Sequence, residues 1–327
     1  MNKFRCVILD DYQQVAFSSA NWTTSFSGLV PPEGVHLLAV PDHIADESEL
    51  VSRIEDCDAV VVMRERTPFQ RSLLARLPNL KLLVTTGMRN AAIDLQAARE
   101  HGVTVCGTAS RSEPPAELTW ALILALARHI VQEASAFRGN GPWQSTIGLD
   151  LHGRTLGLLG LGNIGGRVAR VGAAFGMRVL AWSQNLTTDR ARATGAERAA
   201  SKEQLLEQSD FVSIHLVLSA RTRGLLGAAD LRRMKPTAYL VNTSRAAIVD
   251  QEALVQALRE GWIAGAALDV FEEEPPSAHD PLRSLPNVLA TPHLGYVSRD
   301  NYRTYYGEAV EDIAAFLNGT PIRVLNA

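Results

Sequence analysis

Three kinds of polar side chain in the second half of the sequence stand at the ends of apolar runs that are typical of β-strands. Arg245 follows AYLVNTS, a row of glutamates follows AGAALDVF, and His293 follows NVLATP. An arginine pairs a carboxylate through two parallel hydrogen bonds, and its charge polarises a nearby carbonyl oxygen. A histidine beside a carboxylate has a raised pKa and exchanges protons near neutral pH. Ligands of open α/β sheets bind at the carboxyl ends of strands, so these groups are expected to converge on one site.

A glycine-rich loop lies between a predicted strand, TLGLL, and a helix predicted from Asn163 to Phe175. In this context the first glycine of GLGNIG permits a tight turn, the second lets the backbone approach a pyrophosphate, and the third lets helix and strand pack closely. The first turn of the helix offers unpaired N–H groups to phosphates. The alternative is a turn that binds no ligand. The loop predicts a dinucleotide site formed by Gly160, Gly162, Asn163, Ile164 and Gly165.

The strand after this loop, RVLAWS, lacks the acid that usually binds the adenosine ribose about 20 residues beyond the first glycine. Ser183 and Gln184 stand at that position. Without the carboxylate a 2'-phosphate is not repelled, yet the nearest arginines are Arg190 and Arg192, in the following segment. The sequence therefore permits NADP as well as NAD and requires neither.

The elements that must position these residues follow an alternating pattern. Residues 1 to about 110 contain the β-rich runs CVILDD, VHLLAV, CDAVVVM, LKLLVTT and VTVCG, separated by stretches with helical periodicity. The alternation restarts at TLGLLG and continues to NVLATPH. Strands that alternate with helices predict parallel sheets. The expected fold is α/β, with two Rossmann-like or flavodoxin-like parallel-sheet domains and a cleft between them.

The boundaries of these domains follow from two helical segments. A helical pattern from about Pro114 to Phe137 predicts one long helix that joins the domains, and a second pattern covers Asp300 to Leu317. No predicted strand follows the second helix, so this helix is expected to pack back on the first domain. The substrate-binding (catalytic) domain is then discontinuous, residues 1–108 and 298–327, and residues 109–297 form the dinucleotide-binding Rossmann domain.

The composition excludes several classes of partner. Among 327 residues, 32 Lys and Arg face 35 Asp and Glu, so neither a nucleic-acid surface nor an anionic-membrane surface is expected. No apolar run has the length of a signal peptide or a membrane span, which predicts a cytoplasmic protein. Cys6, Cys57 and Cys106 are far apart and lie in or beside strand-like runs, so we expect buried thiols and no metal site.

Four motifs in order, GLGNIG, VNTSRAAIVD, LDVFEEEP and TPHLG, resemble the D-isomer-specific 2-hydroxyacid dehydrogenases. The similarity extends over nearly the whole chain. It implies that Arg245 binds the substrate carboxylate and carbonyl oxygen, that His293 is the general acid or base, and that Glu274 orients and charges His293. It also implies that Asp269 faces the nicotinamide carboxamide and that family members pair as homodimers through their cofactor domains.

The resemblance places further residues near the ligands. His215 and Thr243, at strand ends, are expected beside the cofactor, and Arg64 is expected to line the substrate site. The family usually has small residues that hold the substrate carboxylate where this chain has TTGMRNAAID, so Gly87, Met88 and Arg89 are candidate substrate-binding residues. Arg89 either pairs with a second anionic group of the substrate or points outward. Trp143 and Tyr296 either shape the substrate pocket or only pack.

Two further departures from the family are Val217, where proline is usual, and Ala246, where glycine is usual. Val217 weakens the expected loop rigidity, and Ala246 argues against a positive φ at that position.

The predicted function is NAD(P)-dependent interconversion of a 2-oxo acid and a (R)-2-hydroxy acid. Taken singly, Arg245 could pair with a surface carboxylate, the glutamates could be a solvated charge run, and His293 could be a packed core histidine. A different class of function is a nicotinamide-sensing interaction protein, like the corepressors that share these motifs. A methyltransferase that binds S-adenosylmethionine would leave Arg245, Glu274 and His293 without roles.

Overall fold

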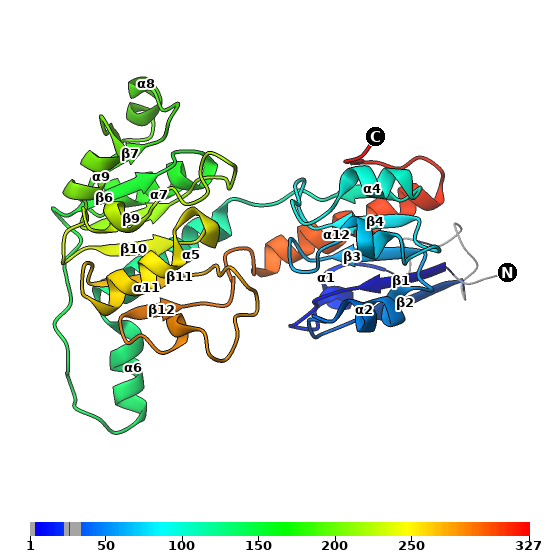
Figure 1. Cartoon of the computed structure of the whole chain (residues 1–327), viewed down its shortest axis with the longest axis horizontal. Helices are drawn as coiled ribbons and strands as arrows, with labels where there is room; N and C mark the ends of the chain where they lie inside the picture. Colours follow the sequence, from blue (N-terminus) through cyan, green and yellow to red (C-terminus); the bar gives the residue numbers. More distant parts are fainter. Residues whose placement is uncertain (1–3, 23–25, 27–33) are drawn as a thin grey trace. The chain divides into compact units, whose positions relative to one another are not determined.

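The computed structural model describes residues 4–22, 26 and 34–327, and the chain divides into two compact units (Figure 1). Unit 1 comprises Met1–Arg111 and Ser298–Ala327, and unit 2 comprises Ser112–Val297. Unit 1 is therefore built from two stretches of chain, whereas unit 2 is built from one. The two parallel sheets confirm the predicted α/β fold class.

Unit 1 contains a five-stranded parallel sheet in the order β2-β1-β3-β4-β5. This is the flavodoxin-like order, which changes direction between β1 and β3 and places ligands at the carboxyl ends of those strands. The inner strands β3 and β4 are buried along their whole length, as expected for a parallel sheet covered on both faces. The strands are β1 (Phe4–Ile8), β2 (Val35–Ala39), β3 (Ala59–Val62), β4 (Leu82–Thr85) and β5 (Thr104–Gly107).

The helices of unit 1 cover this sheet, and the longest of them comes from the end of the sequence. Residues of α12 (Arg299–Leu317) contact α1 and β4, and Tyr305 and Tyr306 are fully buried. The Ser298 side chain caps the helix by accepting from the Asn301 N–H. The other helices are α1 (Ala16–Ser19), α2 (Glu47–Ile54), α3 (Arg71–Leu74) and α4 (Leu95–Glu100).

The chain beyond α12 completes the edge of this sheet. The Asn326 side chain accepts from the Val105 N–H at 2.9 Å and donates to the Val103 carbonyl oxygen at 2.9 Å. Val324 forms an antiparallel bridge with Cys106 on β5. All three cysteines are buried, and burial raises the pKa of Cys57 to about 11 and of Cys106 to about 12. Thiols in this state are poor nucleophiles.

Unit 2 contains a seven-stranded parallel sheet in the order β12-β11-β10-β9-β6-β7-β8. Numbered from β6, this is the Rossmann order with one added strand, and its direction changes between β6 and β9. The sequence analysis did not anticipate β8, a two-residue edge strand. The strands are β6 (Thr155–Leu159), β7 (Arg178–Trp182), β8 (Glu197–Arg198), β9 (Phe211–Ile214), β10 (Tyr239–Asn242), β11 (Gly265–Leu268) and β12 (Val288–Ala290).

The helical pattern predicted as one helix is two helices in the structure. The first, α5 (Glu113–Ala127), begins with prolines in its first turn, and the second is α6 (Ile130–Arg138). His129, between them, has a φ of 49°, which no α-helix contains, so the chain turns there. The sequence pattern did not indicate this break, because arginine and histidine, the residue types at positions 128 and 129, both occur in helices. No helix in the described ranges is long and apolar enough to cross a membrane.

The other helices of unit 2 flank its sheet. Two of them, α7 and α11, are amphipathic and bury one face, and Asp250 caps α11 by accepting from the Ala253 N–H. The helices are α7 (Asn163–Ala174), α8 (Thr188–Arg192), α9 (Lys202–Gln208), α10 (Ala228–Leu231), η2 (Ala246–Ile248), α11 (Gln251–Arg259) and η3 (Pro281–Arg283).

Candidate active site

The three glycines of the loop between β6 and α7 differ in what a side chain would meet. Gly160 has a φ of 101°, and a Cβ there would lie 2.5 Å from the His215 carbonyl oxygen. A Cβ at Gly165 would lie 2.2 Å from the Gly160 carbonyl oxygen. These two glycines are therefore required by the protein's own backbone, the first for the turn and the third for packing α7 against β6.

Gly162 has a different surrounding. A Cβ there would meet no atom within 4 Å among the residues that the structure describes. Gly162 also directly precedes α7, whose first N–H groups have no partners within the helix. A position that is open in the protein and faces helix N–H groups fits the close approach of a pyrophosphate. The loop geometry thus fits a dinucleotide.

The loop lies where the order of the sheet reverses. His215 directly follows β9, the neighbour of β6 at the reversal, and its backbone packs against Gly160. Burial lowers the pKa of His215 to about 4, so its imidazole is neutral at physiological pH. Its Nε2 lies 3.0 Å from Ser213 Oγ. Thr243, after the next strand, pairs with Thr119 of α5 at 2.9 Å between their hydroxyl oxygens.

The end of β7 carries the predicted ribose position. Ser183 is half-buried and Gln184 is exposed, directly after Trp182. The Ser183 carbonyl oxygen accepts from the Leu186 N–H at 3.0 Å, which closes a turn. Arg198 of β8 donates from Nε to the Leu186 carbonyl oxygen at 2.8 Å. The predicted residues thus stand on a short turn at this end of β7, and Arg198 joins them as a basic residue that the sequence analysis missed.

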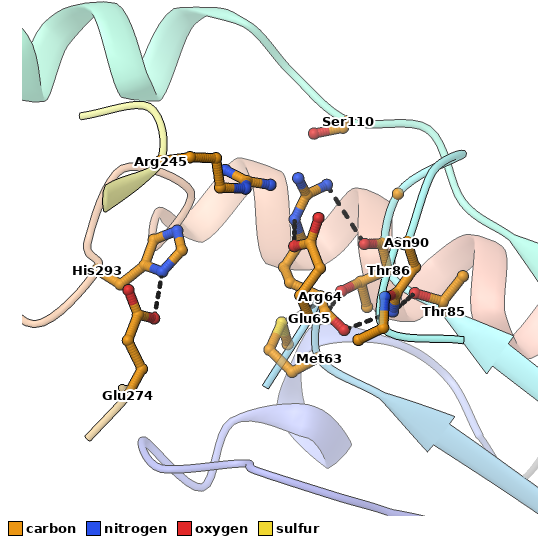
Figure 2. A network of polar contacts seen from close by, with 12 residues as sticks. Met63, Arg64, Glu65, Thr85, Thr86, Asn90, Ser110, Arg245, Glu274 and His293 are labelled. Atoms are coloured by element: carbon orange, nitrogen blue, oxygen red, sulfur yellow. Dashed lines mark hydrogen bonds and ion pairs between the residues drawn. The ribbon is translucent and has the colours of Figure 1, made fainter. Parts of the chain in front are cut away.

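His293 and Glu274 form an acid–base pair in unit 2, and Figure 2 shows the two side chains facing each other. His293 Nδ1 lies 2.6 Å from Glu274 Oε2. The second carboxylate oxygen, Oε1, accepts from the Phe271 N–H at 2.9 Å, so the carboxylate is fixed at both oxygens. Both side chains are only partly exposed, 16% and 20%. The pairing at Nδ1 leaves Nε2 as the ring nitrogen available to a ligand.

Asp269 holds the segment that carries His293. Its carboxylate is fully buried and accepts from the Thr291 hydroxyl at 2.6 Å and from the N–H groups of Leu294 at 2.7 Å and Gly295 at 2.8 Å. Burial raises the pKa of Asp269, although these hydrogen bonds oppose the rise. Asp269 follows β11 and the histidine segment follows β12, so this carboxylate joins two strand ends. The sequence analysis assigned Asp269 only to the cofactor and missed this role.

The histidine itself has an unusual backbone. His293 has a φ of 52°, and its N–H donates to the Thr291 carbonyl oxygen at 2.9 Å. The ring of Tyr296 meets the His293 ring edge-on, with centroids 5.3 Å apart. Left-handed backbone at a residue of this size persists only where the surroundings hold it, and such positions cluster at functional sites. Here the hydrogen bonds of Asp269 hold the segment around His293, and the ring of Tyr296 packs against the His293 ring.

Arg245 follows β10 and is held by the residue that ends this strand. The Asn242 side chain donates to the Arg245 carbonyl oxygen at 3.0 Å and accepts from the Ser244 N–H at 3.0 Å. Arg245 Nη1 donates to the Ser244 carbonyl oxygen at 2.7 Å. With Arg245, Glu274 and His293 after β10, β11 and β12, three adjacent strands of one sheet present these groups at the same edge.

In unit 1 the predicted substrate residues separate into two groups. Arg64 and Gly87, after β3 and β4, touch each other: a Cβ at Gly87 would lie 2.2 Å from Arg64 Nη1. Met88 is 47% exposed and Arg89 is also exposed. In unit 2, Trp143 is 81% exposed and its ring meets that of Phe137. Trp143 therefore lies at a surface, unlike Tyr296.

The chain belongs to the D-isomer specific 2-hydroxyacid dehydrogenase family, because the model of the NAD binding domain of that family matches residues 120–295. This confirms the resemblance that the four motifs carry. The family defines a class of NAD-dependent oxidoreductases, and the matched residues lie within unit 2.

Similar proteins span most of the chain. The glyoxylate reductase of Aeropyrum pernix is 42% identical over 281 residues, which cover 83% of each chain. The D-3-phosphoglycerate dehydrogenase of Methanocaldococcus jannaschii is 37% identical over 275 residues, which are 84% of this chain and 52% of that protein. The crystal structure of a phosphoglycerate oxidoreductase from Vibrio cholerae is similar with a TM-score of 0.91 at 39% identity, covering 98% of this chain and 100% of the other.

Proposed function

We propose that this protein reduces a 2-oxo acid to a (R)-2-hydroxy acid with a nicotinamide cofactor, and catalyses the reverse reaction. The observation that carries the proposal is the His293–Glu274 pair at 2.6 Å, at the same sheet edge as Arg245. An arginine and a carboxylate-bound histidine are the groups that reduction of a 2-oxo acid requires. Family membership supplies the reaction class.

Each side chain then has a stated role. Arg245 binds the substrate carboxylate and stabilises the 2-oxo oxygen as negative charge develops there. Glu274 holds the ring through Nδ1, so His293 delivers a proton to that oxygen from Nε2 and takes it back in the reverse direction. His215, which burial keeps neutral, cannot serve as this acid. A bound nicotinamide supplies or accepts the hydride.

Unit 2 is proposed to bind the cofactor. The α7 N–H groups and Gly162 would hold the pyrophosphate, while Ser183 and Gln184 would meet the ribose. His215, Thr243 and Asp269 complete the proposed cofactor residues. The serine at the ribose position supports acceptance of both NADH and NADPH.

Unit 1 is proposed to bind the substrate. Arg64 and the Gly87 loop would contact its carboxylate, and Met88 and Arg89 would border its side chain. The similar proteins named glyoxylate reductase make a small 2-oxo acid such as glyoxylate the first candidate. The cytoplasmic location predicted from the sequence stays a prediction.

The proposal is tested by initial rates with glyoxylate, hydroxypyruvate, phenylpyruvate, 2-oxoisocaproate and oxaloacetate, each with NADH and with NADPH. His293→Ala should lower kcat by about 100-fold or more while cofactor binding is retained, the usual scale for a general acid. His36→Ala, which removes an exposed imidazole on β2, is the control and should leave kcat unchanged. Equal rates in the wild-type protein and the His293 variant would overturn the assignment.

The panel also separates an enzyme from a nicotinamide-sensing interaction protein. Such a protein would bind NADH and reduce none of the five acids. Turnover of any acid, with loss of turnover in the His293 variant, supports the enzyme.

A homodimer is proposed through α6 and the loop that follows it, which project from the sheet of unit 2 (Figure 1). No residue of α6 is buried, and the segment exposes large apolar side chains: Ile130 by 54%, Val131 by 53%, Phe137 by 70%, Trp143 by 81% and Ile147 by 94%. Apolar patches of this kind mark protein interfaces. Light scattering after size exclusion should give a dimer, and Phe137→Glu with Trp143→Glu should give a monomer.

A further inference from the structure

Arg64 has a backbone conformation that its side chain alone would not favour. Its φ is 55°, in the left-handed region that non-glycine residues rarely adopt. Arg64 stands just beyond the end of β3, beside the point where the sheet order of unit 1 reverses. A residue with such a backbone keeps it only where its neighbours hold it. The backbone conformation in turn sets the direction in which the side chain leaves the chain.

The residue that holds it is Asn90, from the loop after β4. Asn90 Nδ2 donates to the Arg64 carbonyl oxygen at 2.6 Å and to Thr85 Oγ1 at 2.9 Å. Asn90 Oδ1 accepts from the Ala92 N–H at 2.9 Å. The amide thus uses both donors and its acceptor, which fixes its orientation. Figure 2 shows Asn90 between Arg64 and Thr85.

Thr86 holds the peptide group on the other side of the Arg64 Cα. The Arg64 N–H donates to Thr86 Oγ1 at 2.9 Å, and both Thr85 and Thr86 are fully buried. The backbone of Arg64 is therefore bound at its N–H by Thr86 and at its carbonyl by Asn90. Both contacts come from the segment that follows β4, the strand next to β3, so they also fix where Arg64 stands relative to β4.

The Arg64 guanidinium lies between the loop after β4 and the carboxylate of Glu65, whose Oε2 is 3.7 Å from Arg64 Nε. Arg64 Nη1 is 3.4 Å from the Thr86 carbonyl oxygen and occupies the place that a Cβ of Gly87 would fill. The Arg64 side chain is 19% exposed, so one part rests on the loop and another part faces solvent. If φ returned to the ordinary negative range, the side chain would leave from a different direction and this contact would be lost.

We infer that Asn90 is a positioning residue for substrate binding, which acts by holding the carbonyl of Arg64 and so directing its guanidinium. The inference rests on the proposed function, in which Arg64 contacts the carboxylate of a 2-oxo acid. The three hydrogen bonds of the Asn90 side chain described above all go to residues of unit 1. Its removal should weaken binding of the acid and leave the chemical step and the cofactor intact.

The test compares Asn90→Asp, which keeps the shape and the acceptor but lacks both donors, with Asn90→Ala. Both variants should raise the KM for glyoxylate by about tenfold, with kcat within about threefold and the Kd for NADH unchanged. Gln70→Ala is the matched control, because Gln70 Nε2 donates to the Ala92 carbonyl oxygen at 2.8 Å without touching Arg64. An unchanged KM in both Asn90 variants would overturn the inference.

A double-mutant cycle separates positioning from a general structural effect. In an Arg64→Ala background, Asn90→Asp should raise KM no further, because the side chain that Asn90 directs is gone. An additive rise in KM would show that Asn90 acts on the substrate directly or through the fold, and would overturn the inference.

A crystal structure of Asn90→Asp tests the inference independently of activity. Arg64 should leave the left-handed region, and its guanidinium should no longer lie over Gly87. If the wild-type protein reduces neither glyoxylate nor the other acids, the proposed function fails, and this structure still decides the role of Asn90. An Arg64 φ that stays near 55° would then refute it.

Discussion

Each unit carries an arginine just beyond a strand, and in each unit the side chain of an asparagine donates a hydrogen bond to the carbonyl oxygen of that arginine. The two arrangements differ in how far apart the asparagine and the arginine lie in the sequence. In unit 2, Asn242 and Arg245 are three residues apart, and Arg245 is extended, with a φ of −147°. In unit 1, Asn90 is 26 residues beyond Arg64, which is left-handed. The first arrangement is one local turn, whereas the second exists only once β3 and β4 are paired.

The difference fits the two roles proposed for these arginines, catalysis for Arg245 and substrate binding for Arg64. The contact that holds Arg245 joins residues only three apart at the end of β10, which suits the role proposed for Arg245, stabilising charge in the transition state. Arg64 depends on a neighbouring loop, so changes in that loop alter its direction without touching the chemistry. In the proposed function, specificity would be adjusted in unit 1 while the catalytic residues of unit 2 stay the same.

The largest predicted effect is the difference in kinetics between the variants that lack each arginine. Arg245→Ala should lower kcat/KM for glyoxylate by about 1,000-fold with a clear fall in kcat, because charge stabilisation is lost. Arg64→Ala should act mainly on KM, by about tenfold, because only ground-state contact is lost. Steady-state kinetics at saturating NADH distinguish them. A similar fall in kcat for both variants would break the comparison.

The second prediction concerns the glycine loop, which assigns the cofactor to unit 2. Gly165→Ala should lower both the thermal midpoint and cofactor affinity, because its Cβ would lie 2.2 Å from a backbone oxygen. Gly162→Ala should weaken NADH binding by about tenfold or more while the midpoint stays unchanged, because only a bound pyrophosphate would meet the new methyl group. Calorimetry and thermal unfolding measure the two quantities. A Gly162 variant with normal NADH affinity would contradict the site.

The third prediction sharpens the cofactor assignment at the end of β7. Ser183→Asp should shift the ratio of kcat/KM for NADH over NADPH by about tenfold toward NADH, because a carboxylate repels a 2'-phosphate. Ser183→Asn, without the charge, serves as the control and should shift it much less. An unchanged ratio in the aspartate variant would show that this turn does not contact the adenosine ribose of the cofactor.

The smallest predicted effect concerns buried carboxylates, which also differ between the units. Asp269 accepts three hydrogen bonds, whereas Asp312 on α12 accepts from Arg323 Nε at 2.9 Å, and burial raises the pKa of Asp312 to about 7. The folded protein therefore keeps a proton that the unfolded chain releases near pH 4, and this group lowers stability as pH rises from about 4 to about 7.

Asp312→Asn removes this titration and keeps an oxygen for Arg323. Relative to the wild-type protein, the variant should gain about 2 kcal/mol in the free energy of unfolding between pH 5 and pH 8. Urea unfolding at the two pH values measures the change. Parallel pH dependence of both proteins would show that Asp312 is ionised throughout.

Local sequence patterns were enough to predict much of this molecule. The alternation of β-rich runs predicted the two parallel sheets, and GLGNIG, lying between a strand and a helix, predicted the turn that Gly160 and Gly165 form. These features depend on residues within a few positions of one another. The break at His129 was missed because no residue type there opposes a helix.

The contacts that position the candidate site could not be predicted in the same way. Asp269 binds the segment around Thr291 and Leu294, and Asn90 binds Arg64, so each contact joins loops that follow different strands. An asparagine or aspartate in a loop has many possible partners, and pairing of the strands selects one. The motifs therefore indicate which residues are candidates for the site, whereas the pairing of the strands determines which residues hold them in place.

The two-part construction of unit 1 has a consequence for synthesis of the chain. Unit 2, Ser112–Val297, is contiguous, so all of it has been made before α12 emerges. Until then β5 lacks the Val324 bridge and the Asn326 hydrogen bonds, and the sheet lacks Tyr305 and Tyr306. A growing chain can thus complete its second unit first. During that interval the first unit keeps an open strand edge, which is the part of a nascent chain most prone to pair with another chain.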